Sequence, residues 1–94
     1  MNNTYLIQFS SENCPSCFML EQEAHKAVKK FENLTFVNFQ DEATINAYKD
    51  KFNLHKLPAL LLIQDNELLG ILYGSQPEEI LVSWLNAKLK GESK

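Results

Sequence analysis

The 94-residue sequence is short of the features that mark several protein classes. Its net charge is −3, with 9 basic and 12 acidic residues, which argues against nucleic acid as the main partner because neutralising phosphates needs a basic face. No apolar run approaches the length of a membrane-spanning helix, and there is no repeat or low-complexity tract. Cysteine is scarce too: there are only two, and a bridge closing so short a loop would stabilise little through loop entropy.

The N-terminus has no charged segment followed by a long apolar stretch, so we predict no signal peptide and expect a reducing, cytoplasmic location. In such a compartment, two cysteines at this spacing are more often redox-active or metal-binding than structural. Hydrophobic residues make up 45% of the chain, which is ample for one packed core. We expect a single domain over residues 1–90, followed by a frayed tail over 91–94.

The most informative feature is Cys14-Pro15-Ser16-Cys17, which lies between a strand-like run and a helix-like run. Pro15 suits the first turn of a helix, where its missing N–H costs nothing. A helix N-terminus presents unpaired N–H groups and the positive end of the dipole, so a thiol there ionises more readily than a free one. Cys17, one turn later, is close enough to attack a mixed disulfide. The spacing therefore favours thiol–disulfide exchange.

Hydrophobic periodicity predicts seven elements in the order β-α-β-α-β-β-α. A continuous apolar run opened by proline predicts a strand that is buried on both faces. Strands separated by helices imply parallel neighbours, and a tight turn at 65–66 adds an antiparallel edge to an α/β sheet. The predicted strands are 5–9, 35–39, 58–63 and 67–73. The first predicted helix starts at the C-x-x-C motif and ends by Asn33, the second covers Asp41 to Phe52 with Asp41 as a candidate N-cap, and the last fades at Gly91.

Local signals add detail at the helix ends and in the core. Glu12 and Asn13 are candidate caps of the first helix, and residues 75–78 form a capping box for the last. Phe18 and Trp84 recur at helical spacing and are expected to face the core. Gly70 is expected to mark a bulge or a close backbone approach.

The sequence resembles the thioredoxin superfamily over nearly its whole length. The resemblance rests on a strand leading into C-x-x-C, the helix behind it, Leu57-Pro58 before a buried strand, the hairpin, and Gly74 before the final helix. It implies a minimal thioredoxin fold, with a four-stranded mixed sheet flanked by three helices. The resemblance is to a minimal version, which we expect to lack the extra N-terminal β-α unit of thioredoxin itself.

The resemblance also implies residue roles. It assigns Cys14 as the nucleophile and Cys17 as the resolving thiol, with Pro15 and Ser16 positioning them. It implies a cis peptide bond between Leu57 and Pro58 beside the disulfide. Leu57 and Gly74 would lie on the rim that faces the substrate.

The sequence departs from the thioredoxin pattern at several places. The position of the usual buried aspartate is Gln8, and that of its accompanying lysine is Asn38. Tryptophans common in the family correspond to Ser10 and Asn13. Because an amide cannot act as a general base, we hypothesise that deprotonation of Cys17 is slow at neutral pH. The alternative is that Gln8 is simply a satisfied polar core residue.

His55 and Lys56 precede Leu57-Pro58, so the fold would carry them near the active-site rim. A positive charge there favours the Cys14 thiolate and attracts acidic partners. The competing interpretation is an ordinary solvated loop. A zinc site would need about four ligands, and His25 is too far from Cys17 along its helix to share an ion, so we predict no metal.

The resemblance implies a cytoplasmic protein-disulfide reductase. We expect disulfide-containing protein substrates, electrons from a thioredoxin reductase or from glutathione, and no cofactor beyond the redox-active Cys14–Cys17 disulfide. We also expect a monomer, with neither nucleic acid nor membrane as a partner. Two alternatives stay open: a thioredoxin-like binding module with idle cysteines, and a redox sensor whose disulfide changes the affinity for a partner.

Overall fold

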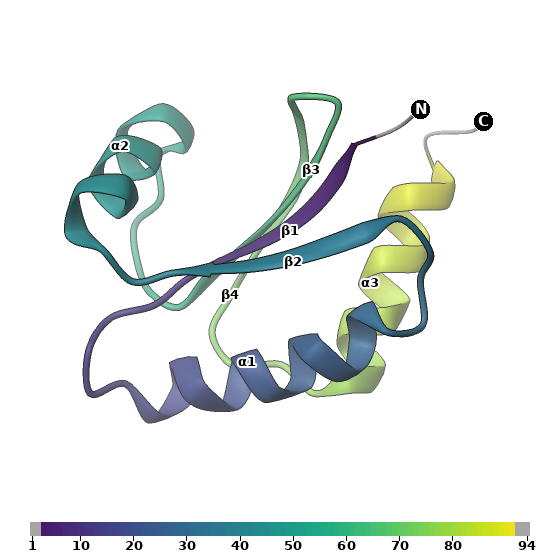
Figure 1. The fold of residues 1–94 in the computed structure, drawn as a ribbon, viewed down its shortest axis with the longest axis horizontal. Helices are drawn as coiled ribbons and strands as arrows, with labels where there is room; N and C mark the ends of the chain where they lie inside the picture. The colour runs from purple at the N-terminus through teal and green to yellow at the C-terminus, as the bar shows by residue number, and fades with distance from the viewer. Residues whose placement is uncertain (1–2, 92–94) are drawn as a thin grey trace.

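The computed structural model describes residues 3–91, and its seven elements follow the predicted order (Figure 1). The strands are β1 (Thr4–Phe9), β2 (Leu34–Phe39), β3 (Ala59–Gln64) and β4 (Glu67–Tyr73). The helices are α1 (Pro15–Val28), α2 (Glu42–Phe52) and α3 (Glu78–Gly91). Gly91 is therefore helical, and the rest of the predicted tail, residues 92–94, lies outside the described residues.

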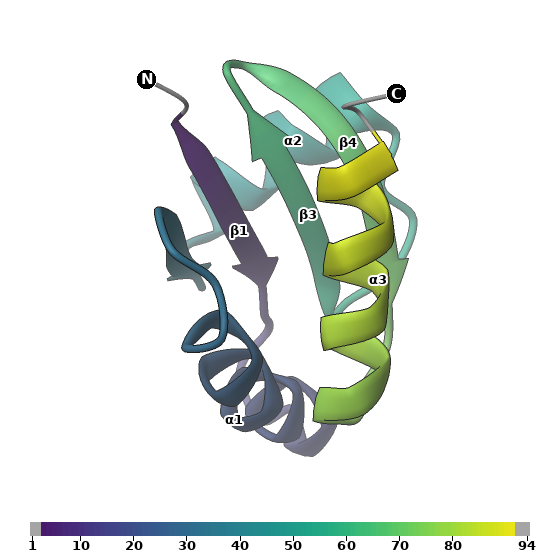
Figure 2. The same cartoon turned by 90° about the vertical axis from the view of Figure 1, so that its right-hand side faces the viewer.

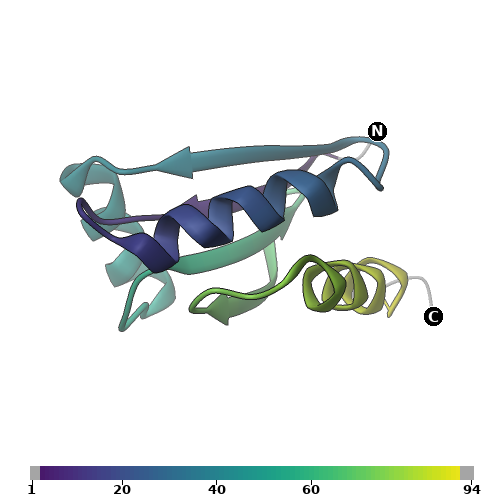
Figure 3. The same cartoon turned by 90° about the horizontal axis from the view of Figure 1, so that it is seen from below.

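The four strands form one mixed sheet in the order β2-β1-β3-β4. β1 and β2 are parallel, whereas β3 runs antiparallel to both β1 and β4. Helices α1 and α3 lie together on one side of this sheet, and α2 lies on the other (Figures 1 and 2). The view from below shows α1 running along the strands, with α3 beside it (Figure 3). This architecture confirms the predicted α/β fold.

β3 separates two apolar cores, which explains its uninterrupted hydrophobic sequence. Leu60 and Leu62 belong to the core under α1 and α3, whereas Leu61 belongs to the core under α2. All three side chains are fully buried. Since successive side chains of a strand point to opposite faces, a strand between two layers must be apolar at every position. The predicted doubly buried strand is confirmed.

The strand register brings four loops to one end of the sheet. Phe9, the last residue of β1, pairs with Phe39 of β2 and with Ala59 of β3. Ala59 in turn pairs with Tyr73, the last residue of β4. The segments that follow β1, β2 and β4 and the segment that precedes β3 therefore meet at this end. It holds the two cysteines and the segment around Pro58.

Both predicted helix caps on this side of the sheet are wrong, because the structure supplies others. The N-cap of α1 is Cys14, whose sulfur accepts the Cys17 N–H, while Asn13 has a left-handed φ of 53°. α3 starts at Glu78, and its first N–H donates to Glu23 of α1 at 2.7 Å. A carboxylate from the neighbouring helix thus replaces the local capping box.

Gly70 combines the two roles expected of it. The β3–β4 register shifts between Leu62 and Ile63, where the bulge lies. A Cβ on Gly70 would come within 2.9 Å of Cε of Lys88 and 3.1 Å of the Trp84 ring, so α3 approaches the strand closely here. Trp84 packs against the core, as predicted.

Candidate active site

Cys14 and Cys17 form a disulfide at the start of α1, with their Cα atoms 5.2 Å apart. Cys14 is half-buried, whereas only 4% of Cys17 is exposed. The Cys17 N–H donates to the Cys14 sulfur at 3.1 Å, and the Ser16 hydroxyl lies 3.5 Å from the same sulfur. Donors at a helix N-terminus favour a negatively charged sulfur. The geometry thus provides one reachable, electrostatically supported sulfur and one covered sulfur.

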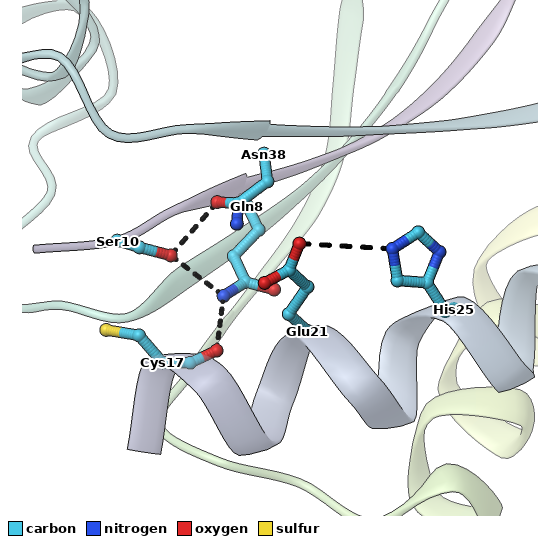
Figure 4. A network of polar contacts seen from close by, with 6 residues as sticks. All are labelled: Gln8, Ser10, Cys17, Glu21, His25 and Asn38. Carbon is cyan, nitrogen blue, oxygen red and sulfur yellow. Dashed lines mark hydrogen bonds and ion pairs between the residues drawn. The ribbon is translucent and has the colours of Figure 1, made fainter. Parts of the chain in front are cut away.

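Behind the disulfide, three side chains form a buried hydrogen-bonded group, which we call the Gln8 cluster: Gln8, Ser10 and Asn38 (Figure 4). Nε2 of Gln8 donates to Oγ of Ser10 at 2.9 Å and to the backbone carbonyl of Cys17 at 2.8 Å. The Ser10 hydroxyl donates to Oδ1 of Asn38 at 3.0 Å. Gln8 and Ser10 are fully buried. The cluster therefore links the sheet directly to the first turn of α1.

Each member of the Gln8 cluster occupies a position where the sequence departs from the thioredoxin pattern. Gln8 and Asn38 are direct neighbours in the parallel β1–β2 register, and Ser10 lies two residues beyond Gln8. The sequence shows each of these three departures separately, but it does not predict that the three side chains contact one another. The signal was available only in part, because the pairing depends on the register between two strands that are distant in sequence.

The orientation of the Gln8 amide follows from its partners. A backbone carbonyl can only accept, so the NH₂ group must face Cys17. Oε1 then lacks a hydrogen-bond partner within the described part of the chain, although it is buried. Two good hydrogen bonds therefore offset one unpaired acceptor, whose desolvation costs about 1–3 kcal/mol. Gln8 is neither a base nor a fully satisfied core residue.

The segment before β3 and the end of β4 lie at the same end of the sheet as the segment that carries the disulfide. The Leu57–Pro58 bond is cis, as the resemblance implied, and Pro58 is fully buried. Gly74 donates its N–H to the Pro58 carbonyl at 3.0 Å, so the two residues lie side by side. The φ of Gly74 is +79°, a conformation that glycine adopts readily. Leu57 is partly buried against the core under α2.

His55 and Lys56 lie against Tyr73, the last residue of β4. The ring centroids of His55 and Tyr73 are 4.5 Å apart, and Nζ of Lys56 lies 6.0 Å from the Tyr73 ring centroid. Both residues are exposed. The structure therefore places these two residues at the sheet end that carries the disulfide, and Tyr73 restricts their positions.

Phe18 does not face the core: 63% of it is exposed. The buried positions of α1 are Cys17, Leu20, Ala24 and Ala27, and this stripe leaves Phe18 to one side of it. Phe18 instead lines a cavity of about 350 Å³ beside the disulfide, together with residues 10–14, Cys17, Glu21 and Gln40.

Among residues 3–91, no group of three or more histidine, cysteine, aspartate or glutamate side chains is arranged to hold a metal ion. The His25 side chain is 57% exposed, lies 3.9 Å from a Glu21 carboxylate oxygen, and meets the Phe36 ring edge-on. It is an exposed residue of α1. None of the helices in the described region has the length and apolar character to cross a bilayer.

A disulfide at a helix N-terminus and a cis-proline before a central strand, on a mixed four-stranded sheet, define the thioredoxin-fold class of thiol–disulfide proteins. The sequence profile of the thioredoxin family matches residues 1–87. The chain therefore belongs to the thioredoxin family. A comparison of the sequence with curated proteins finds no match.

Solved structures with the same fold include three thioredoxins from distant organisms. A single-residue variant of Halobacterium salinarum thioredoxin is 22% identical, with a TM-score of 0.77, over 93% of this chain and 75% of that chain. Spinach chloroplast thioredoxin f is 11% identical, with a TM-score of 0.77, over 94% and 78%. Thioredoxin-2 of the malaria parasite is 19% identical, with a TM-score of 0.75, over 90% and 82%. At these identities the likeness shows the fold alone.

Proposed function

We propose that this protein is a protein-disulfide reductase in which Cys14 attacks and Cys17 resolves. The observation that carries the proposal is the difference between the two sulfurs. Cys14 is half-buried and receives the Cys17 N–H, whereas Cys17 is 4% exposed. A substrate sulfur can approach the first sulfur more easily than the second, and the reduced Cys14 is the thiol that the helix N-terminus helps to ionise.

The reaction has two exchange steps. The Cys14 thiolate attacks one sulfur of the substrate disulfide, which breaks the substrate S–S bond and forms a mixed disulfide; the leaving thiolate takes a proton from solvent. Cys17 then loses its proton and attacks the Cys14 sulfur, which releases the second substrate thiol. The substrate gains two electrons and two protons, and the protein is left with the Cys14–Cys17 disulfide. A thioredoxin reductase or glutathione returns the two electrons.

The Gln8 cluster gives the second step a particular character. In it, Gln8 holds the Cys17 backbone and supplies no carboxylate to take the Cys17 proton. Solvent must therefore accept that proton, so we expect resolution to be the slower step at neutral pH. In this proposal Gln8 is a positioning residue: it holds the Cys17 backbone and does not accept the proton.

The surroundings of the reaction follow from the same proposal. The substrates are disulfide-containing proteins, the reduced form works as a monomer in the cytoplasm, and no organic cofactor or metal takes part beyond the disulfide itself. Leu57, Pro58 and Gly74 form the rim against which extended substrate chain would lie. Support comes from the Gly74–Pro58 hydrogen bond, which holds two of these residues together, and from the register, which brings them to the end of the sheet that carries the disulfide.

A turnover assay tests the proposal. The protein is supplied with NADPH and thioredoxin reductase, or with glutathione and its reductase, and reduction of a protein disulfide is followed through NADPH consumption. We expect catalytic turnover by the wild type and none by the double variant Cys14→Ser/Cys17→Ser. If the double variant binds the same partner as tightly as the wild type and neither protein turns over, the binding-module alternative replaces this proposal. Partner affinity that changes with oxidation, again without turnover, indicates the redox sensor.

A further inference from the structure

An exposed apolar pair stands directly beside the disulfide on α1. Phe18 is 63% exposed and Met19 is 58% exposed. Of the large hydrophobic residues that are exposed in the described chain, the others are Tyr5 and Ile80, which are isolated from each other in sequence. Single exposed apolar residues need no explanation, but two in succession next to a reactive group mark a contact surface.

Phe18 lines the cavity of about 350 Å³ at Cys14 and Cys17. The other residues of its lining include residues 10–13 of the loop before α1 and Glu21, one turn after Cys17. We call this cavity the Phe18 subsite. It is a different surface from the rim of Leu57, Pro58 and Gly74, none of which lines it. A chain bound across the disulfide would therefore meet the rim on one side and the Phe18 subsite on the other.

The charges around the Phe18 subsite have one sign. Glu12 and Glu21 are the charged residues of its described lining, which includes no lysine or histidine. The Glu21 side chain keeps 31% of its surface exposed, and its ionic neighbour is the exposed His25, 3.9 Å away. The adjoining cavity shares residues 10–12 and Gln40 and adds Asp41 and Glu42 against the single cation Lys49. Complementary charge steers and selects partners, so this side of the disulfide favours a cationic one.

We propose that the Phe18 subsite recognises the substrate segment next to the target cysteine, and that it selects segments carrying lysine or arginine beside an apolar residue. The apolar side chain packs on Phe18, and the cationic side chain meets Glu12 and Glu21. The proposal rests on the proposed function, because the occupant is held beside Cys14 while its disulfide is exchanged. It adds a substrate class: disulfides in basic, partly apolar sequence.

Two disulfide-linked peptides test this selection. They are identical except that lysines flank the cysteine in one and glutamates in the other, and both carry a leucine next to it. The measurement is the ratio of kcat/KM for the two peptides at low ionic strength. We expect the wild type to prefer the lysine peptide by about fivefold, since exposed ion pairs each make only a modest contribution to binding. The preference should shrink with added salt, because exposed charges are screened.

Matched variants distinguish a preference that comes from the Phe18 subsite from one that comes from the overall charge of the protein. Glu12→Gln/Glu21→Gln should bring the ratio close to one. Glu67→Gln removes an exposed carboxylate at the opposite end of the sheet, and the ratio should stay at the wild-type value. Phe18→Ser should lower kcat/KM for both peptides by about fivefold through lost apolar contact. Ile80→Ser, on α3 and also exposed, should leave both values unchanged.

Small hydroxyethyl disulfide separates failure of the subsite from failure of the exchange function. Turnover of this neutral disulfide, without a lysine preference or with a preference that survives Glu12→Gln/Glu21→Gln, overturns the subsite and leaves the proposed function standing. No turnover of any disulfide overturns the proposed function, and the subsite with it. A preference for the glutamate peptide would show that His55 and Lys56, and not the Phe18 subsite, choose the substrate.

Discussion

The two sulfurs of the motif lie in different surroundings although they are bonded to each other. Cys14 is half-buried at the N-cap of α1, where it meets the Cys17 N–H and the Ser16 hydroxyl. Cys17 is almost fully buried, and Gln8 holds its backbone carbonyl. One sulfur thus belongs to a half-buried residue at the helix N-cap, whereas the backbone of the other cysteine is hydrogen-bonded to the sheet.

In the proposed mechanism, the two cysteines of this short motif have different tasks. The helix N-terminus acts on Cys14 through donors that exist in any helix, so this part of the mechanism needs only the position of the residue. The environment of Cys17 depends on which side chains lie behind it, and here those side chains are neutral. The first exchange step should therefore behave as in other dithiol proteins, whereas the second should depend on solvent.

The largest effects are expected when the two cysteine sulfurs are removed one at a time. Cys14→Ser should abolish exchange, because the remaining thiol is buried. Cys17→Ser should still attack, and should accumulate a stoichiometric mixed disulfide through Cys14. Mass spectrometry after acid quenching identifies the trapped cysteine. Equal trapping by the two variants would contradict the division of roles.

A carboxylate introduced behind Cys17 should speed the second exchange step and leave the first unchanged. Gln8→Asp is expected to speed resolution of the mixed disulfide by about tenfold, a modest share of what a positioned general base contributes. Gln8→Asn is the matched control, since it has the size of aspartate without its charge. Stopped-flow measurement of the second step distinguishes them. Resolution by Gln8→Asp that is no faster than by Gln8→Asn would show that proton removal does not limit this step.

Neutralising the loop before Pro58 should have a smaller effect on the Cys14 side. His55→Gln/Lys56→Gln should raise the pH at which Cys14 ionises by a small but measurable amount, since exposed charges are strongly screened. Thiolate absorbance against pH measures this, with Lys29→Gln beyond the far end of α1 as the control. If the ionisation of Cys14 does not move, the loop is an ordinary solvated one.

The Glu23 carboxylate, which pairs with Lys26 within α1 and accepts the Glu78 N–H of α3, lies away from both sulfurs and should affect stability alone. The pKa of Glu23 lies below its usual value, chiefly because the Lys26 ammonium donates to it at 2.8 Å and then because the Glu78 N–H does. A carboxylate with a lowered folded-state pKa stabilises the fold above its unfolded-state pKa, and this contribution is lost as the pH falls through the folded-state value.

Glu23→Gln should therefore unfold at lower urea concentration than the wild type at neutral pH. The gap should narrow in acid, once the pH falls through the lowered folded-state pKa of Glu23 and the carboxylate of the wild type becomes protonated. Urea titrations at both pH values check this, with catalytic turnover as the control. A gap that is constant with pH would assign the effect to something other than ionised Glu23.

Much of this molecule could be predicted from its sequence because the signals are local. Three features can be predicted from a few neighbouring residues: the apolar strand β3, the helix start at the C-x-x-C motif, and the Asp41 N-cap of α2. The Gln8 cluster could not be predicted, because it needs the β1–β2 register. The exposure of Phe18 depends on how α1 is rotated against the sheet, and the cap of α3 comes from Glu23, 55 residues earlier in the chain.

The reduction potential of the Cys14/Cys17 couple tests the proposed reductase mechanism most directly. The protein is equilibrated in dithiothreitol or glutathione redox buffers, quenched by alkylation, and read by mass. The account predicts a reversible two-electron couple at about −270 to −200 mV, the range of reductases with this chemistry. A potential near about −120 mV would contradict the reducing direction. Failure to form an intramolecular disulfide at any potential would contradict the exchange mechanism itself.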